Sequence, residues 1–268
     1  MKKILEDKSD IDHLNLGDIH VGGLGAIFPP NAKEYNGDPK PQIKLQKWIY
    51  KNYIEDLTKV GKVDVITDFG DNTDGQELKI SGRTLVSTDT DNQVIWATEC
   101  LQKAIDICKP SYFISLDGTP YHVSTGGGSC DFQVHNSLKK DNPDIEFIYE
   151  QTLVIKIGEL IYSLAHPYPT TDQKIPPLEK LIHQHAADFY LDNTPRIDVF
   201  GRGHAHFYSW LSYRGGAYAY VVPCQQVYSD FAKRKFYLGV RHPDVGVLKI
   251  HQEEKLLMPQ VYLHKWRE

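Results

Sequence analysis

The sequence predicts an α/β fold. Short apolar runs alternate with stretches of helical periodicity, the chain is 41% hydrophobic and 24% charged, and it contains no internal repeat or low-complexity tract. A chain of 268 residues could hold two small domains, but α/β chains of this length are often one domain, and no segment has the composition of a linker. We therefore expect a single domain over residues 1–268.

The predicted elements follow from the spacing of the apolar residues. The runs with strand character are residues 12–16, 63–69, 112–116, 147–154, 160–164, 197–200, 217–223 and 245–251. Runs 147–154 and 160–164 are expected to meet as a hairpin near Gly158. Helical spacing covers residues 42–60, 94–107 and 177–191. The Gly- and Pro-rich segment 21–41 and the polar stretch 73–92 are expected to form loops.

Charge and cysteine usage exclude several classes of protein. With 35 acidic and 30 basic residues, the formal charge of −5 gives no sequence-wide attraction to nucleic acid, and the one tight basic cluster, Lys233-Arg234-Lys235, is typical of a solvated face. Four cysteines without a C-x-x-C pair are too few for a disulfide scaffold. No apolar run approaches the roughly 18 residues of a membrane span, and the first residues lack the apolar core of a signal peptide. We expect a cytoplasmic protein that does not interact with membranes.

Aspartate and histidine follow five of the strand-like runs. The positions are Asp18 with His20, Asp71, the segment 117–122, His166, and His204 with His206. In α/β sheets, binding groups gather outside the carboxyl ends of the strands, so these side chains are expected to share one pocket. Imidazole and carboxylate without thiolate suit Zn²⁺, Mn²⁺ or iron ions. Because His204 and His206 are two residues apart, an extended backbone would point both to the same side.

Each motif alone has an ordinary structural explanation. Asp18-Ile19-His20 is typical of a turn beside a strand, Gly70-Asp71-Asn72 is a turn signature, and about half of all Gly-His-x-His segments would serve packing. The shared placement at strand ends and the order along the chain favour a functional site.

Together these motifs resemble those of the calcineurin-like metallophosphoesterase superfamily. Its signature is D-x-H, G-D-x-x-D, G-N-H-E/D, a single His and G-H-x-H, and four of the five motifs match here between about residues 12 and 225. The resemblance implies a four-layered α/β/β/α sandwich of two mixed sheets flanked by helices. It also implies a centre of two divalent metal ions (Mn, Zn or Fe) at the strand ends.

The resemblance assigns a role to each matching residue. One metal would be held by Asp18, His20 and His206, the second by His166 and His204, and Asp71 would bridge them. Asp74 would orient the loop that carries Asp71. Two cations about 4 Å apart repel each other, and a bridging carboxylate and hydroxide offset that repulsion.

The third motif departs from the family pattern. After the strand at 112–116 the chain reads Gly118-Thr119-Pro120-Tyr121-His122, so no asparagine follows the glycine. Thr119 would take the asparagine position and complete the shell of the second metal. His122 would assist the leaving group; the alternatives are that His122 ligates the second metal itself or is an ordinary loop histidine.

The function that the resemblance implies is that of a metal-dependent phosphoesterase. It would hydrolyse a phosphomonoester or phosphodiester by attack of a metal-bridging hydroxide, and we expect a small-molecule substrate. One alternative is a metal-dependent nuclease of the same fold, against which the acidic balance argues mildly. The other is a non-catalytic module that keeps the fold and metals as a scaffold, an alternative that the altered third motif leaves open.

Overall fold

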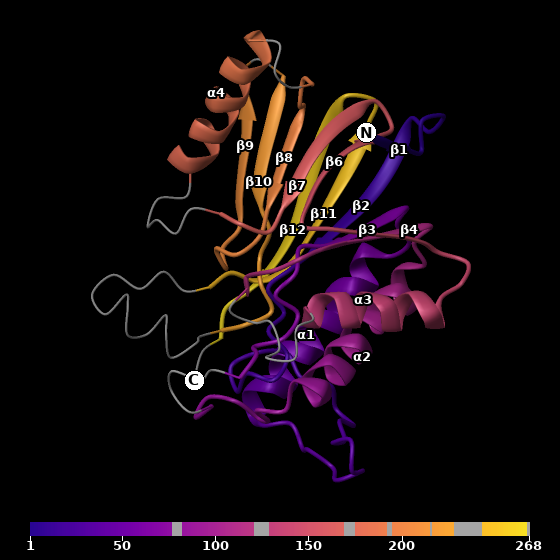
Figure 1. Cartoon of the computed structure of the whole chain (residues 1–268), viewed down its shortest axis with the longest axis vertical. Helices are drawn as coiled ribbons and strands as arrows, with labels where there is room; N and C mark the ends of the chain where they lie inside the picture. The colour runs from indigo at the N-terminus through magenta and orange to yellow at the C-terminus, as the bar shows by residue number, and fades with distance from the viewer. Residues whose placement is uncertain are drawn as a thin grey trace.

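The protein is built on two mixed sheets of six strands each (Figure 1). The computed structural model describes residues 1–76, 82–120, 129–168, 175–191, 195–214, 216–227 and 243–266. The predicted α/β class is confirmed, and every strand end that the motifs singled out lies in one of the two sheets or directly after it.

The first sheet has the strand order β12-β11-β2-β3-β4-β5. Its parallel part consists of β2 (Asp10–Leu16), β3 (Val65–Asp68), β4 (Tyr112–Leu116) and β5 (Glu146–Glu150). Two antiparallel strands, β11 (Val245–Glu253) and β12 (Leu256–His264), extend it beyond β2. Strand β2 is therefore interior to the sheet, between β3 and β11.

The second sheet has the strand order β1-β6-β7-β8-β10-β9. Its strands are β1 (Lys2–Ile4), β6 (Thr152–Ile157), β7 (Leu160–Ala165), β8 (Val199–Arg202), β9 (Ser209–Tyr213) and β10 (Ala217–Val221). Strands β7, β8 and β10 run parallel, so β7 and β8 present their carboxyl ends at the same edge.

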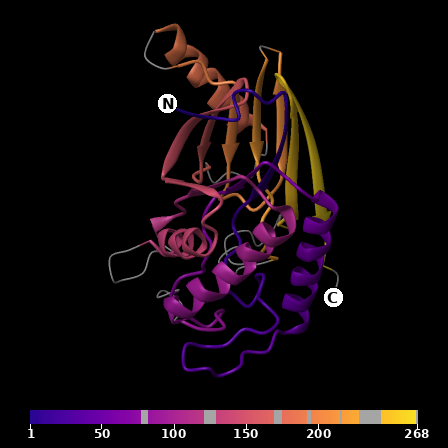
Figure 2. The same ribbon diagram turned by 90° about the vertical axis from the view of Figure 1, so that its right-hand side faces the viewer.

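Helices cover the outer faces of both sheets. The first sheet packs against α1 (Lys44–Val60), α2 (Thr90–Cys108) and α3 (Cys130–Asp141), through a core that includes Leu14, Leu57 and Leu101. The second sheet packs against α4 (Pro176–Tyr190), whose Leu178 and Ile182 contact the core around Phe200. Figures 1 and 2 show α4 at one end of the molecule and the other three helices at the opposite end. The predicted α/β/β/α layering is confirmed.

The space between the sheets holds an apolar core with a few polar side chains. Because side chains alternate along a strand, Leu14 and Leu16 of β2 face the helices while Ile11, His13 and Asn15 face the second sheet. His13 Nε2 lies 2.7 Å from Thr67 Oγ1, and the Tyr220 hydroxyl donates to Asn15 Oδ1 over 2.8 Å. These hydrogen bonds satisfy polar groups that would otherwise be buried at a cost of about 1–3 kcal/mol each.

The structure corrects several predicted boundaries. The run 147–154 is divided between β5 and β6, which lie in different sheets, while the hairpin of β6 and β7 is confirmed. Strands β1, β9 and β12 and helix α3 have no counterpart among the predicted elements. Residues 90–92 of the expected polar loop belong to α2, which begins after its N-cap Asp89.

Two further expectations concern composition. All four cysteines are free and buried, so none of them forms a disulfide. Among the described residues, none of the helices has the length and hydropathy needed to cross a membrane.

Candidate metal centre

Two loops at the carboxyl ends of β2 and β3 continue the pairing of these strands beyond the sheet. Backbone N–H groups of Asp18 and His20 donate to the carbonyl oxygens of Gly70 and Asp71, both over 3.0 Å. Gly203 N–H donates to His166 O over 3.2 Å, which joins the loops after β7 and β8 in the second sheet. The predicted metal ligands Asp18, His20, Asp71, His166, His204 and His206 are thus carried by four neighbouring loops, two from each sheet.

The first candidate cluster consists of Asp18, His20 and His206, whose potential ligand atoms all lie within 4.8 Å of one another. The Nε2 atoms of His20 and His206 are 3.1 Å apart, and His206 Nε2 lies 3.5 Å from Asp18 Oδ1. Asp18 also accepts the His204 N–H at 2.9 Å, which fixes the carboxylate against the loop after β8.

The second candidate cluster consists of Asp71, His166 and His204, again with ligand atoms within 4.8 Å of one another. His166 Nε2 lies 3.0 Å from Asp71 Oδ2 and 3.2 Å from His204 Nδ1. Asp71 Oδ2 is also 4.0 Å from His20 Nε2, so this carboxylate lies between the two clusters. The structure therefore brings the six residues together in two adjacent groups of three.

The hydrogen bonds behind the clusters test whether they suit a cation. His166 Nδ1 lies 2.7 Å from the Phe69 carbonyl oxygen. Because a carbonyl oxygen can only accept a hydrogen bond, His166 Nδ1 carries a proton, and the lone pair of Nε2 faces the second cluster. His20 Nδ1 lies 3.1 Å from Asp74 Oδ1, which turns His20 Nε2 toward the first cluster. Lone pairs and carboxylate oxygens that converge in this way repel one another unless a cation lies among them. Ring nitrogens fixed by an outer acceptor are the usual arrangement of metal-binding histidines, and nitrogen and oxygen donors suit divalent transition ions.

The pKa values of the histidines report the same excess of negative charge. Burial lowers the pKa of His166, but the charge and hydrogen bond of Asp71 outweigh it and raise the pKa to about 10. Burial likewise lowers the pKa of His20, and Asp74, Asp71 and Asp18 raise it to about 9. For His206, burial prevails and the pKa falls to about 4. The clusters attract positive charge strongly enough to overcome the desolvation of two buried imidazoles.

Backbone strain is concentrated in the same residues. Among the described residues, eight that are not glycine have positive φ, and five of them belong to the clusters: Asp18, His20, Asp71, His204 and His206. Such conformations cost of order 1 kcal/mol or more and persist where the surrounding structure imposes them, often at functional sites. Positive φ also corrects one sequence argument. His204 and His206 are not extended and do not share one side; they belong to different clusters.

Thr119 lies directly on the candidate bridging residue. Its N–H and its hydroxyl both donate to Asp71 Oδ1, over 2.6 and 2.9 Å. A Cβ on Gly118 would lie 2.1 Å from Asp71 Oδ1, so only glycine lets this loop approach so closely. The altered third motif is therefore in contact with Asp71, while His122 lies outside the described residues.

Two buried side chains that the motifs do not include hold the loop of residues 70–75. Asp131, in the first turn of α3, accepts the N–H groups of Asp71, Asn72 and Gly118 over 3.1, 2.9 and 2.8 Å. Gln93, in the first turn of α2, accepts the N–H groups of Asp74 and Gly75 over 3.1 and 3.0 Å. Their only sequence signal is a polar residue near the start of a helix, which is too common to identify either of them.

His135, on α3, is in neither cluster. Its Nδ1 lies 3.0 Å from Ser115 Oγ between α3 and β4, and burial lowers its pKa to about 4. His135 is therefore a core residue behind the site.

Comparison with known proteins gives distant likenesses in structure. No model of a known protein family matches the chain, and no curated protein matches it. Chaetomium thermophilum Vps29 complexed with a cyclic peptide is 12% identical, with 97% of this chain and 91% of that chain covered and a TM-score of 0.47. A metallophosphoesterase from Sphaerobacter thermophilus is 11% identical, with coverage of 96% and 90% and a TM-score of 0.42. A predicted phosphoesterase from Streptococcus pneumoniae is 9% identical, with coverage of 95% and 99% and a TM-score of 0.37.

The solved structures that this chain resembles thus include one described as a metallophosphoesterase. At identities of 9–12% these likenesses concern the fold, and they are distant. The identity and geometry of the clustered side chains are the stronger basis for a function.

Proposed function

We propose that this protein is a metal-dependent phosphoesterase with a two-metal centre. Asp18, His20 and His206 would hold one divalent ion and His166 and His204 the other, with Asp71 between them. The observation that carries the proposal is the convergence of imidazole lone pairs and carboxylates in two adjacent clusters with fixed outer hydrogen bonds. A pair of divalent ions in such a site would polarise a phosphoryl oxygen and lower the pKa of water.

The chain itself would set the geometry of this chemistry. Asp74 orients His20, and the Phe69 carbonyl orients His166. Thr119, with its hydroxyl 2.9 and 3.0 Å from the two Asp71 oxygens, is placed to keep this carboxylate in one orientation or to turn toward the second ion. His122 comes three residues later in the sequence, and we propose that it donates a proton to the leaving oxygen.

The exposure of the ligands indicates where a substrate would enter. The side chains of Asp18, Asp71 and His166 are at most 2% exposed, whereas those of His204 and His206 are 28% and 25% exposed. A phosphoester would therefore approach over the two histidines that follow β8. The net charge of −5 favours a small phosphoester over a nucleic acid.

Metal analysis and phosphodiester hydrolysis test the proposal together. The purified protein, loaded with Mn²⁺, is expected to hold two ions per chain and to hydrolyse bis(p-nitrophenyl) phosphate. Asp71→Asn keeps the shape of the side chain but removes the charge placed between the clusters, so both metal content and turnover should fall. Asp106→Asn, at a half-exposed position on α2, is the matched control and should behave as wild type.

The outcomes separate the competing functions. Two bound ions without hydrolysis of mono- or diesters would favour the non-catalytic scaffold, whereas cleavage of a DNA oligonucleotide in preference to the small diester would favour the nuclease. Metal content near zero at saturating Mn²⁺, or an Asp71→Asn variant with wild-type activity, would contradict the two-metal proposal.

A further inference from the structure

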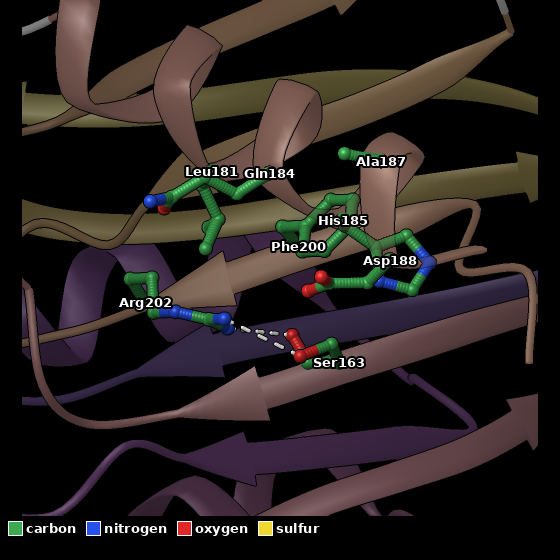
Figure 3. Close-up of a pocket in the computed structure, with 8 residues that line it drawn as sticks. All are labelled: Ser163, Leu181, Gln184, His185, Ala187, Asp188, Phe200 and Arg202. Carbon is green, nitrogen blue, oxygen red and sulfur yellow. Dashed lines mark hydrogen bonds between the residues drawn. The ribbon is translucent and has the colours of Figure 1, made fainter. Parts of the chain in front are cut away.

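A cavity whose lining includes no residue of the two clusters lies between α4 and the outer face of the second sheet. Its volume is about 540 Å³, within the range of small-molecule sites. Figure 3 shows its lining, which comes from β7, β8 and α4: Ser163, Leu181, Gln184, His185, Ala187, Asp188, Phe200 and Arg202.

Arg202 forms the floor of this cavity and lacks a matching charge. Side chains alternate along β8, so Phe200 and Arg202 face α4 whereas Val199 faces the first sheet. Among the described residues, no carboxylate oxygen is within 4.0 Å of its guanidinium group, whose acceptors are Ser163 O, Gly201 O and Ser163 Oγ at 2.8, 2.7 and 3.3 Å.

Further hydrogen-bond donors line the same cavity. Ser163 Oγ accepts from Arg202, so its own proton can be donated to another group. His185 Nε2 accepts the Ile197 N–H over 3.0 Å, which places the ring proton of the imidazole on Nδ1. A cation and two neutral donors around one cavity favour an anionic ligand. Asp188, at an exposed position on α4, adds one carboxylate to this lining.

We propose that this cavity binds a small oxyanion, a phosphate or carboxylate group, with Arg202 as its anchor. The planar guanidinium group suits both kinds of oxyanion, since its parallel N–H groups match two oxygen atoms. Arg202 also ties β7 to β8, the strands that lead to His166 and His204. An anion at this position therefore lies beside the strands that carry two of the candidate metal ligands.

Titration of the metal-free full chain with inorganic phosphate tests the site apart from the metal centre. In the presence of a chelator, phosphate should bind once per chain by calorimetry, and Arg202→Met should weaken binding at least tenfold. Arg214→Met, at an exposed arginine outside the cavity, is the matched control and should bind as wild type. A parallel titration with succinate distinguishes the two oxyanions, because the true ligand class should bind more tightly.

A second variant is needed because Arg202→Met also removes the hydrogen bonds that join β7 to β8. Ala187→Phe fills the cavity from the exposed side of α4 and leaves Arg202 in place, so it should abolish binding in a folded protein. Absence of binding of both anions to wild type would overturn the proposal, as would unchanged affinity in both variants. Neither outcome depends on phosphoesterase activity, so this site and the proposed function can fail separately.

Discussion

His13, a buried residue outside every motif, contributes to the response of this protein to pH. It is buried between the sheets, its Nδ1 has no hydrogen-bond partner in the part of the chain that the structure describes, and burial lowers its pKa from 6.5 to about 3. Between these two pH values the unfolded chain binds a proton at His13 that the folded chain excludes. The free energy of unfolding therefore falls as the pH falls through this window, and the contribution of His13 is fully present above it.

We predict that His13→Gln flattens this pH dependence. Relative to the variant, the wild type should lose about 1.4 kcal/mol of unfolding free energy per pH unit between about pH 6 and pH 4. Urea denaturation of both proteins in the presence of a chelator measures the difference. His183→Gln, at an exposed position on α4, should leave the wild-type slope unchanged; equal slopes for wild type and His13→Gln would contradict the prediction.

His122 calls for a test by substitution. If it donates a proton to the leaving oxygen, His122→Ala should keep its metal content and slow turnover by roughly 10²–10⁴-fold, with a smaller loss for nitrophenolate esters than for alkyl esters. If it ligates the second metal, the variant should lose metal and slow all substrates alike. Metal content measured beside rates for both kinds of ester decides between these roles, and an unaffected variant would make it an ordinary loop residue.

The six candidate ligands could be predicted from the sequence because each is part of a short motif at a strand end. Their positive φ values could not, since nothing in the pattern G-H-x-H distinguishes an extended segment from the left-handed turns that send His204 and His206 to different clusters. The roles of Asp131 and Gln93 could not be predicted from the sequence either. Their importance depends on which distant loop meets the start of a helix, and only the packed structure determines that.

At the scale of elements, the first turns of α2 and α3 act on the loop of residues 70–75 from two sides. Gln93 holds Asp74 and Gly75, and Asp131 holds Asp71 and Asn72. Because α2 and α3 also pack against each other, the loop is attached to a rigid pair of helices. The helices thus contribute to the site although they carry none of the candidate ligands.

We predict that Asp131→Asn weakens both the fold and the site. The amide replaces one accepting oxygen by a donor, and at least one buried N–H loses its partner at a cost of about 1–3 kcal/mol. The resulting displacement of Asp71 should lower turnover roughly 10²-fold. Urea denaturation and phosphodiester hydrolysis measure the two effects. Asp141→Asn, at the exposed end of the same helix, is the control, and identical behaviour of the two variants would contradict the positioning role.

The elements that sequence patterns predicted best are the long helices and the interior parallel strands. Because their apolar residues contact a core on one or both faces, these residues recur along the sequence at the spacing typical of a helix or a buried strand. Helix α3 was missed because its apolar residues Cys130, Val134 and Leu138 recur only every fourth position and its N-cap Ser129 follows a glycine-rich segment. The passage of the chain from the first sheet to the second at Gln151 was not predicted, because residues of high β-strand propensity lie both before and after Gln151.

At the scale of the whole molecule, the candidate metal centre joins the two sheets. Asp18, His20 and Asp71 follow strands of the first sheet, whereas His166, His204 and His206 follow strands of the second. Each cluster includes residues from both. A bound ion would therefore stabilise the contact between the sheets as well as the local loops.

We predict a single cooperative thermal transition that shifts with metal. An ion present at 100 times its Kd stabilises the folded state by about 2.7 kcal/mol, which corresponds to roughly 5–10 °C in Tm for a chain of this size. Calorimetry with Mn²⁺ and with a chelator measures the shift, and Asp71→Asn should reduce it. Two separate transitions would contradict the single domain, and an unchanged Tm would contradict tight metal binding.

The interior position of β2 bears on how the chain folds during synthesis. β2 leaves the ribosome long before β11, Val245–Glu253, which covers one of its edges. At about 5–20 residues per second, this edge stays open for on the order of ten seconds, and an open strand edge invites pairing with other chains. His206 emerges in the same late period, so the nascent protein would acquire its complete ligand set only shortly before its first sheet is closed.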